Sequence, residues 1–291
     1  MTQKQYQRFL ESELGPGTPT EALFHIIPAP YEKNVSYGTG TAAGPAAILA
    51  ASQQLELFDG ISIPAEHGIC TLPPLSCTGS AEEALAEIAA AVNDVLLHNT
   101  TIPVVLGGEH TVTVGALQAV RQRYDNCGVV QFDAHADLRD TYEGSRYSHA
   151  CVMRRALDME FPLYQVGVRS LSHAEELLRQ EKEIGRLDGA AIGCAAMPDP
   201  ILPADFPHNI YLTIDVDVLD PAVIPATGTP EPGGLSWYQM MQALSTVMRG
   251  RRVIGFDVVE LAPVAGLHGP DYTVARLIYN LFGMISRNNQ L

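Results

Sequence analysis

The stretch from Val129 to Asp137, which reads Val-Val-Gln-Phe-Asp-Ala-His-Ala-Asp, constrains the fold and chemistry of this chain more than any other. A short apolar run, typical of a buried strand, ends there in Asp133, His135 and Asp137. The spacing of two places all three side chains on one face if the backbone stays extended. Carboxylates that repel one another at a strand end need a cation to be tolerated. The stretch therefore predicts a cleft lined by metal ligands.

Three further apolar runs end in polar residues of the same kinds. They lead into Gly107-Gly108-Glu109-His110, Asp215-Val216-Asp217 and Asp257-Val258-Val259-Glu260. A single strand-end His or Asp is usually a helix cap or a satisfied polar group, and the Gly-Gly turn could cradle a phosphate, although it lacks the full phosphate-loop pattern. Together, however, the strand ends offer four carboxylates and two imidazoles to one cleft: His110, Asp133, His135, Asp137, Asp215 and Asp217.

This set of donors indicates a pair of divalent metal ions. Six ligands are more than one tetrahedral zinc site uses. The set is rich in oxygen and contains no cysteine, which favours manganese over zinc, while iron, nickel and cobalt are also compatible with it.

Alternating strands and helices predict the fold class. Ser80 and Ser172 are each followed three residues later by Glu, a capping-box pattern that begins a helix. Parallel strands need such crossovers, so we expect a largely parallel sheet covered on both faces, a three-layer α/β/α fold. The clearest strands are 102–106, 128–132, 209–214 and 252–259, and weaker candidates lie near Ile61 and Ile69.

Length and composition indicate one domain preceded by a short arm. The chain has 291 residues, of which 46% are hydrophobic, enough to bury both faces of a sheet. Residues 1–20 end in a run of Gly and Pro that disfavours regular structure, and we expect this arm to pack on a neighbour. Residues 21–291 form the predicted domain.

Charge and cysteine usage limit the partners and the compartment. The formal net charge of -15 argues against nucleic acid and anionic membranes and is compatible with a cationic substrate. Five scattered cysteines without a CxxC pair suit reduced thiols. The sequence contains neither a signal-peptide core nor an uncharged apolar run of about 18 residues, so we expect a cytoplasmic protein.

These motifs resemble the ureohydrolase family, the arginase and agmatinase group. The resemblance extends from about Pro30 to Ile285, and several separate motifs follow one another in the order of the family: Gly107 to His110, Phe132 to Asp137, the His149 segment, Thr213 to Pro221, Gly228 to Gly234 and Phe256 to Glu260. It implies an arginase-like three-layer fold, two manganese ions per subunit, and hydrolysis of a guanidino group to urea and an amine. It also implies a homo-oligomer, commonly a trimer or hexamer.

The resemblance implies two sets of ligands. One manganese would be bound by His110, Asp133, Asp137 and Asp215, and the other by Asp133, His135, Asp215 and Asp217. Asp133 and Asp215 would bridge the two ions. Four carboxylates then offset two Mn²⁺, a bridging hydroxide leaves the site near -1, and a guanidinium restores neutrality.

The resemblance also implies roles in catalysis. In such an enzyme a hydroxide held by the two ions would attack the guanidinium carbon. Asp137 resembles the acceptor of the hydroxide proton, Glu260 the carboxylate that pairs with the guanidinium, and His149 the proton shuttle for the departing amine. From the residues alone, Ser148-His149 at a helix start is equally well read as a cap.

The loop 138–147 carries the expected selectivity. It does not match the arginase pattern and looks like agmatinase, which implies hydrolysis of agmatine to putrescine and urea and a place in polyamine biosynthesis. Asp140 and Glu143 would favour the distal ammonium of agmatine, whereas Arg139 or Arg146 would pair with a carboxylate. One alternative is therefore a hydrolase of guanidinobutyrate or a related compound. A second is a catalytically silent family member that binds metal.

Overall fold

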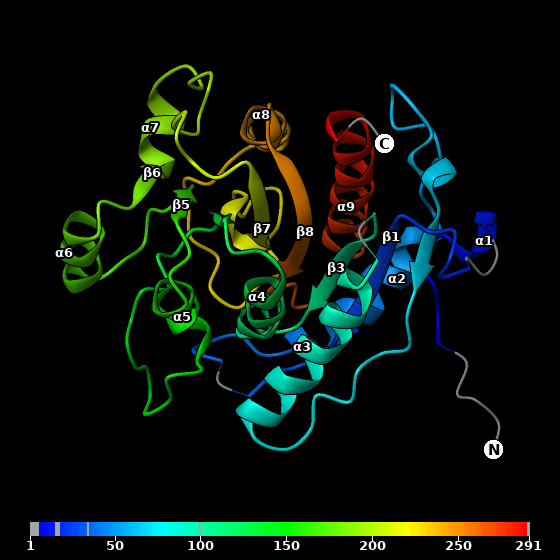
Figure 1. The fold of residues 1–291 in the computed structure, drawn as a ribbon, viewed down its shortest axis with the longest axis horizontal. Helices are drawn as coiled ribbons and strands as arrows, with labels where there is room; N and C mark the ends of the chain where they lie inside the picture. The colour runs from blue at the N-terminus through cyan, green and yellow to red at the C-terminus, as the bar shows by residue number, and fades with distance from the viewer. Residues whose placement is uncertain (1–5, 15–17, 34, 99, 290–291) are drawn as a thin grey trace.

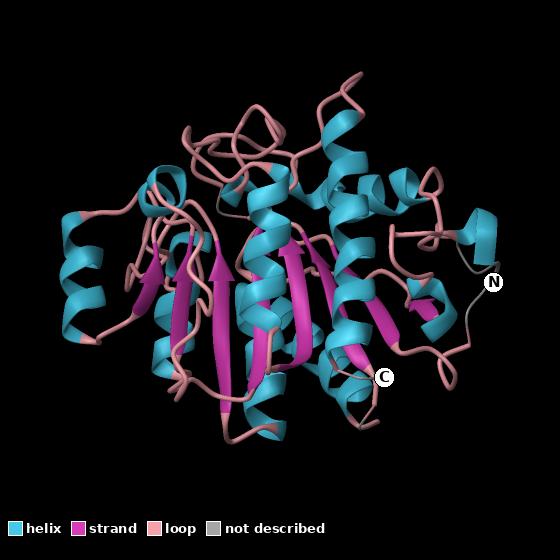
Figure 2. Ribbon diagram, turned by 90° about the horizontal axis from the view of Figure 1, so that it is seen from above, coloured by secondary structure: helices cyan, strands magenta, loops and turns pink. Residues whose placement is uncertain are grey.

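The computed structural model describes residues 6–14, 18–33, 35–98 and 100–289. These residues contain one sheet of eight strands in the order β2-β1-β3-β8-β7-β4-β5-β6, and every neighbouring pair is parallel. In Figure 2 the central strands point the same way, toward the edge of the sheet where long loops gather. The strands are β1 (Phe24–Ala29), β2 (Ile69–Thr71), β3 (Ile102–Gly107), β4 (Cys127–Phe132), β5 (Leu163–Val166), β6 (Gly185–Leu187), β7 (Asn209–Asp215) and β8 (Arg252–Val259).

Helices cover both faces of the sheet, which confirms the predicted three-layer α/β/α fold. Figure 1 shows α8 and α9 above the sheet and α3, α4 and α5 below it. Two buried apolar clusters hold these layers together, one including Ile48, Leu244 and Phe282 and the other Ile88 and Leu117. The helices are α1 (Glu11–Leu14), α2 (Gly44–Ser52), α3 (Ala81–Leu96), α4 (Val112–Arg123), α5 (Val152–Asp158), α6 (His173–Glu181), α7 (Gly189–Cys194), α8 (Trp237–Met248) and α9 (Gly269–Asn288), with 3₁₀ turns η1 (Thr41–Ala43), η2 (Pro64–His67), η3 (His149–Cys151) and η4 (Val216–Val218).

Local sequence signals account for most of these elements. The capping boxes at Ser80 and Ser172 are present, because each hydroxyl accepts the N–H of the Glu three residues later while that Glu accepts the N–H of the serine. The strand candidate near Ile69 is β2, but the candidate near Ile61 is wrong. Ile61 lies in a loop, pairs with no strand that the structure describes, and its side chain is 71% exposed.

The described part of the N-terminal segment packs against the body of its own chain. The Phe9 ring meets the edge of Phe282 with 5.7 Å between centroids, and the Leu10 N–H donates to the Ser52 hydroxyl at 3.0 Å. Residues 15–17, within the predicted Gly/Pro run, lie outside the described residues. The division into an arm (1–20) and a domain (21–291) stays a prediction. Among the described residues, no helix has the length and apolar character that crossing a bilayer requires.

The order of the strands brings the predicted site together. β3, β8, β7 and β4 are neighbours at the centre of the sheet, and all run in parallel. Their carboxyl ends therefore open on one edge, the position at which open α/β sheets bind ligands. β3 leads to His110, β8 to Glu260, β7 to Asp215 and Asp217, and β4 to Asp133.

The backbone beyond β4 is not the extended run that would place three ligands on one strand face. β4 ends at Phe132, and Asp137 has a φ of 52°. The segment bends because its carbonyls accept hydrogen bonds from two places, the loop after β5 and the start of α5. The Ala134 carbonyl accepts from Arg169 and Ser170, and the Asp137 carbonyl accepts from the start of α5. The predicted ligands therefore converge through a bend.

Candidate active site

A cavity of about 330 Å³ opens beyond the carboxyl ends of the central strands. Asp133 lies beneath the cavity surface with no exposed area. The structure thus brings all the sequence-predicted site residues to one place, seven strand-end side chains and His149. Those that line the cavity are His110, His135, Asp137, His149, Asp215, Asp217 and Glu260.

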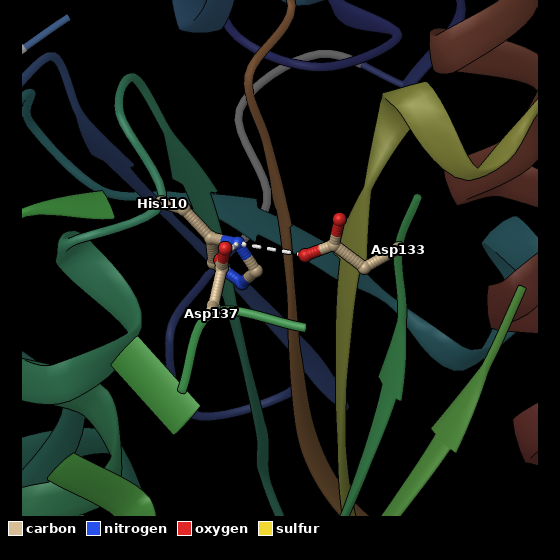
Figure 3. Close-up of side chains that lie close together, drawn as sticks. All are labelled: His110, Asp133 and Asp137. Carbon is tan, nitrogen blue, oxygen red and sulfur yellow. Dashed lines mark ion pairs between the residues drawn. The ribbon is translucent and has the colours of Figure 1, made fainter. Parts of the chain in front are cut away.

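One cluster of possible ligands surrounds the His110 ring. Its Nδ1 lies 3.0 Å from Asp137 Oδ2 and 3.2 Å from Asp133 Oδ2, and Figure 3 shows both carboxylates directed toward the ring. Asp215 Oδ2 is 3.5 Å from the same nitrogen. These four residues are the set expected for the first ion.

A second cluster shares Asp133 with the first. His135 Nδ1 lies 2.9 Å from Asp217 Oδ2 and 3.6 Å from Asp133 Oδ1. The main chain fixes these groups relative to one another, because the Ala134 N–H donates to Asp217 Oδ1 at 3.0 Å and the Asp217 N–H donates to Asp215 Oδ1 at 2.9 Å. Two adjacent clusters with one common carboxylate could hold two ions side by side.

A buried relay orients the His110 ring. The Thr213 hydroxyl donates to Asp257 at 2.7 Å and therefore accepts from His110 Nε2, 2.8 Å away. Tyr211 donates to the other Asp257 oxygen at 2.9 Å. Such partners set the tautomer of a histidine ligand and leave its other nitrogen for the metal. Sequence reasoning singled out the strand end at Asp257 but assigned it no role.

The donors present fit divalent metal ions. His110 Nδ1 is buried and has no hydrogen-bond partner, although carboxylate oxygens surround it. Its Nε2 is engaged by Thr213, so Nδ1 presents a lone pair to those oxygens when the imidazole is neutral. Carboxylate oxygens and imidazole nitrogens are ligands that suit several divalent ions. Cys151, which follows His149 by two residues, is buried away from the cavity, and burial raises the pKa of its thiol to about 11.

Burial and mutual repulsion shift the pKa values of the site. Burial, with Asp133 close by, raises the pKa of Asp137 to about 6. Burial also raises the pKa of Asp215 well above its usual range, and the Asp217 and Asp133 charges add to this effect. For Glu260, burial next to Glu109 and Asp217 raises the pKa to about 8. A group of carboxyls that resists ionisation is one that a cation would stabilise.

The two remaining predicted catalytic residues face the cavity from different segments. Glu260 follows β8 with a φ of 65°, and its Oε1 accepts the His110 N–H at 2.6 Å. His149 begins η3, and its Nε2 lies 2.7 Å from the Ser36 hydroxyl. Ser148 forms no capping bond with its side chain, so the structure offers no support for the cap interpretation. Ser36 carries no sequence signal that would have linked it to this site.

The loop 138–147 presents a basic rather than an acidic group to the cavity. Arg139 lines it, with its guanidinium 5.2 Å from the Tyr142 ring centroid. Asp140 instead pairs with Arg155 at 2.6 Å and lies outside the cavity lining. Glu143 is exposed in the turn of the loop and is also outside it. The acidic group of this region that does line the cavity is Glu175, from α6.

Arg146 is likewise occupied elsewhere. Its guanidinium pairs with Asp158 at 3.2 Å and does not line the cavity. Of the four charged side chains that the sequence offered for substrate recognition, Arg139 is thus the one within reach of a bound molecule.

Comparisons with known proteins agree on one family. A family model described as the arginase family matches residues 22–283. The N(1)-aminopropylagmatine ureohydrolase of Synechocystis is 36% identical over 95% of this chain and 93% of its own length. The agmatinase of Pyrococcus horikoshii is 32% identical over 96% of this chain and 98% of its own length. The crystal structure of the agmatine ureohydrolase of Thermoplasma volcanium, 28% identical, matches with a TM-score of 0.86 and covers 98% of this chain and 96% of that one. This chain therefore belongs to the arginase family and is a ureohydrolase, a hydrolase that acts on guanidino groups.

Proposed function

We propose that this enzyme hydrolyses agmatine to putrescine and urea with two Mn²⁺ ions bound by the paired clusters. The observation that carries the proposal is the geometry of the site: two ligand clusters share Asp133 and open, beside Glu260, into one cavity. With two ions and a bridging hydroxide the site would carry a charge near -1, which suits a cationic substrate. The agmatinase-like loop 138–147 and the agmatinase relative support agmatine in particular.

The six ligands divide between the ions as the family resemblance implies. His110, Asp133, Asp137 and Asp215 would bind one ion, and Asp133, His135, Asp215 and Asp217 the other. When bound, such a pair lowers the pKa of a shared water and so supplies a nucleophile at neutral pH. Manganese fits the oxygen-rich donor set better than zinc does.

The side chains around the ions perform the rest of the reaction. Ionised Glu260 pairs with the guanidinium and holds its carbon toward the ligand clusters, which shortens the approach of the reactants. Asp137 accepts the proton that the attacking water loses. His149 then gives a proton to the departing amine, which would otherwise leave as a poor, anionic group.

A second candidate substrate is N(1)-aminopropylagmatine, which names the Synechocystis relative and a Thermus thermophilus relative that is 37% identical over 91% of this chain. Both substrates have the same guanidino end and a cationic tail. The rival with the opposite tail charge is guanidinobutyrate, which Arg139 would favour. We also propose that the enzyme is cytoplasmic, acts in polyamine biosynthesis and forms a homo-oligomer, a trimer or hexamer.

A panel of substrates tests the assignment. Urea release by the manganese-loaded enzyme is measured with agmatine, N(1)-aminopropylagmatine, guanidinobutyrate and arginine at matched concentrations. We expect the highest kcat/KM for agmatine and a value for guanidinobutyrate at least about tenfold lower, because the tail charge is reversed. Preference for aminopropylagmatine would replace the substrate and keep the chemistry. Preference for guanidinobutyrate would contradict the assignment, and a metal-loaded protein that releases no urea would support the silent alternative.

Substitutions test the proposed catalytic roles. Asp137→Asn and His149→Ala should each lower kcat by roughly 10²- to 10⁴-fold at saturating Mn²⁺, because each removes a proton-transfer group. Glu143→Gln is the matched control, since Glu143 is exposed and lies outside the cavity lining. Circular dichroism and the melting temperature should show that all three variants stay folded. Wild-type rates for His149→Ala would refute its role as proton shuttle.

The pH dependence of metal binding follows from the shifted pKa values. The pKa of Asp137 is raised to about 6 by burial and Asp133, and that of His135 is raised by Asp133 and Asp217 despite the opposing effect of its burial. Asp137 has largely lost its proton above pH 6, whereas His135 keeps its proton from pH 6 to pH 8 and must lose it to bind a metal. Mn²⁺ affinity should therefore rise over this range, by about tenfold per pH unit for each proton released.

Calorimetric titration of metal-free protein with MnCl₂, in buffers of different ionisation enthalpy, measures both the affinity and the protons released. The free energy of unfolding of the metal-free protein should also depend on pH through these groups, but in the opposite direction. A raised carboxyl pKa stabilises the fold below about pH 4 and loses that contribution as the pH rises through the folded value. For Asp137 this window ends near pH 6. An affinity that does not change between pH 6 and pH 8 would contradict the proposed ligand set.

A further inference from the structure

Arg169 uses its whole guanidinium to bind the main chain. The residue lies beyond β5 and is half-buried. Each of its two terminal nitrogens reaches two carbonyls and its Nε reaches one, so the bonds equal the five N–H donors that an arginine carries. The acceptors are the carbonyls of Asp217 and Glu231 at 2.7 Å, Pro232 at 3.1 Å, Gly167 at 3.2 Å and Val218 at 3.4 Å.

Four of these carbonyls belong to two segments that line the cavity. Asp217 and Val218 are in η4, which carries a proposed ligand. Glu231 and Pro232 are in the loop that contributes Gly228 and Thr229 to the cavity wall. Asp220 links the same two segments, because its Oδ2 accepts from the N–H groups of Gly233 and Gly234 at 3.0 and 3.1 Å.

The main chain of Arg169 reaches the other half of the same ligand cluster. Its N–H donates to the Ala134 carbonyl at 2.9 Å, between Asp133 and His135. The Ala134 N–H in turn donates to the Asp217 carboxylate. Arg169 therefore bonds to the carbonyl that precedes His135 and to the carbonyl of Asp217. Together with the bond from Ala134 to Asp217, these contacts close a ring of hydrogen bonds.

The His110–Asp137 cluster is held by different groups. His110 is oriented by Thr213 and Asp257. The Asp137 carbonyl accepts the N–H groups of Met153 and Arg154, in α5, at 3.0 and 3.2 Å. The two halves of the site thus rest on different side-chain supports, although they share Asp133 and, in the proposed ligand sets, Asp215.

We infer that Arg169 is a positioning residue that sets the metal affinity of the His135–Asp217 half of the site independently of the His110–Asp137 half. The inference rests on the proposed pair of metal ions. Lysine cannot replace Arg169, because an ammonium carries three donors on a single nitrogen and cannot bind five carbonyls that are spread around three guanidinium nitrogens. Without that support, η4 and the loop 228–234 would relax, and Asp217 would lose its fixed distance from His135.

Manganese binding by the full-length chain tests the inference. Metal-free wild-type protein and Arg169→Lys are titrated with MnCl₂ alone, and free Mn²⁺ is followed by electron paramagnetic resonance. We expect wild type to bind two ions, and Arg169→Lys to bind one ion within threefold of the wild-type affinity and the other about 10- to 100-fold more weakly. At two equivalents of Mn²⁺ per chain, the coupled-pair spectrum of wild type should be replaced in the variant by single-ion lines.

Arg251→Lys provides the matched control. Arg251 is also half-buried and donates to main-chain carbonyls, those of Pro203 and Phe206 at 2.6 and 2.7 Å, but it precedes β8 at the opposite end of the sheet. Both ions should bind this variant as they bind wild type. The melting temperature of each metal-free variant reports on the fold, and Arg169→Gln, which keeps a planar amide donor, provides a second variant at the same position.

The outcomes separate the inference from the proposed function. Unchanged binding of both ions in both Arg169 variants would overturn the inference, as would equal weakening of both ions, which indicates a general loss of structure. A wild-type chain that binds fewer than two ions would instead refute the proposed metal pair, and the inference would fall with it. Selective loss of one ion in Arg169→Lys, with Arg251→Lys unchanged, supports the inference.

Discussion

The repulsion among buried carboxylates at the end of the central strands is the constraint on which the rest of the site depends. Asp133, Asp137, Asp215 and Asp217 approach the same two imidazoles within 2.9 to 3.6 Å, and each is at most 6% exposed. Such a group is stable only if it is protonated or neutralised by cations. Without metal, burial raises the pKa values of Asp137, Asp215 and Asp217, whereas the two imidazoles hold the pKa of Asp133 below its usual range despite its burial. Two divalent ions would offset the four charges directly.

The fold supplies the rigidity that this arrangement requires. Neighbouring parallel strands place the ligands on a common edge, and hydrogen bonds from the main chain then fix the individual side chains. The support is asymmetric: a Thr213–Asp257 relay orients His110, whereas Arg169 and Asp220 connect η4 to the cavity wall. Ligand loops built in this way keep their geometry because main-chain hydrogen bonds connect them to one another and to the start of α5.

The sequence was most informative where a pattern has a single physical meaning. Apolar runs ending in Asp or His predicted the strands and the converging site, and capping boxes predicted the starts of α3 and α6. The bend at Asp137 could not be predicted from the sequence. It depends on hydrogen bonds that the carbonyls of this segment accept from Arg169 and from the start of α5, which are distant in sequence. The same holds for Ser36 beside His149. Nor could the sequence place the acidic groups of loop 138–147, since Asp140 lies outside the cavity lining in an ion pair with Arg155 that spacing does not reveal.

The central claim is that the two clusters bind a bridged pair of metal ions. Diffraction from crystals grown with MnCl₂, recorded on both sides of the manganese absorption edge, tests it most directly. We predict two anomalous peaks per chain about 3.5–4 Å apart, one beside His110 and Asp137, the other beside His135 and Asp217, with Asp133 and Asp215 between them. A single peak, or peaks away from these side chains, would contradict the account.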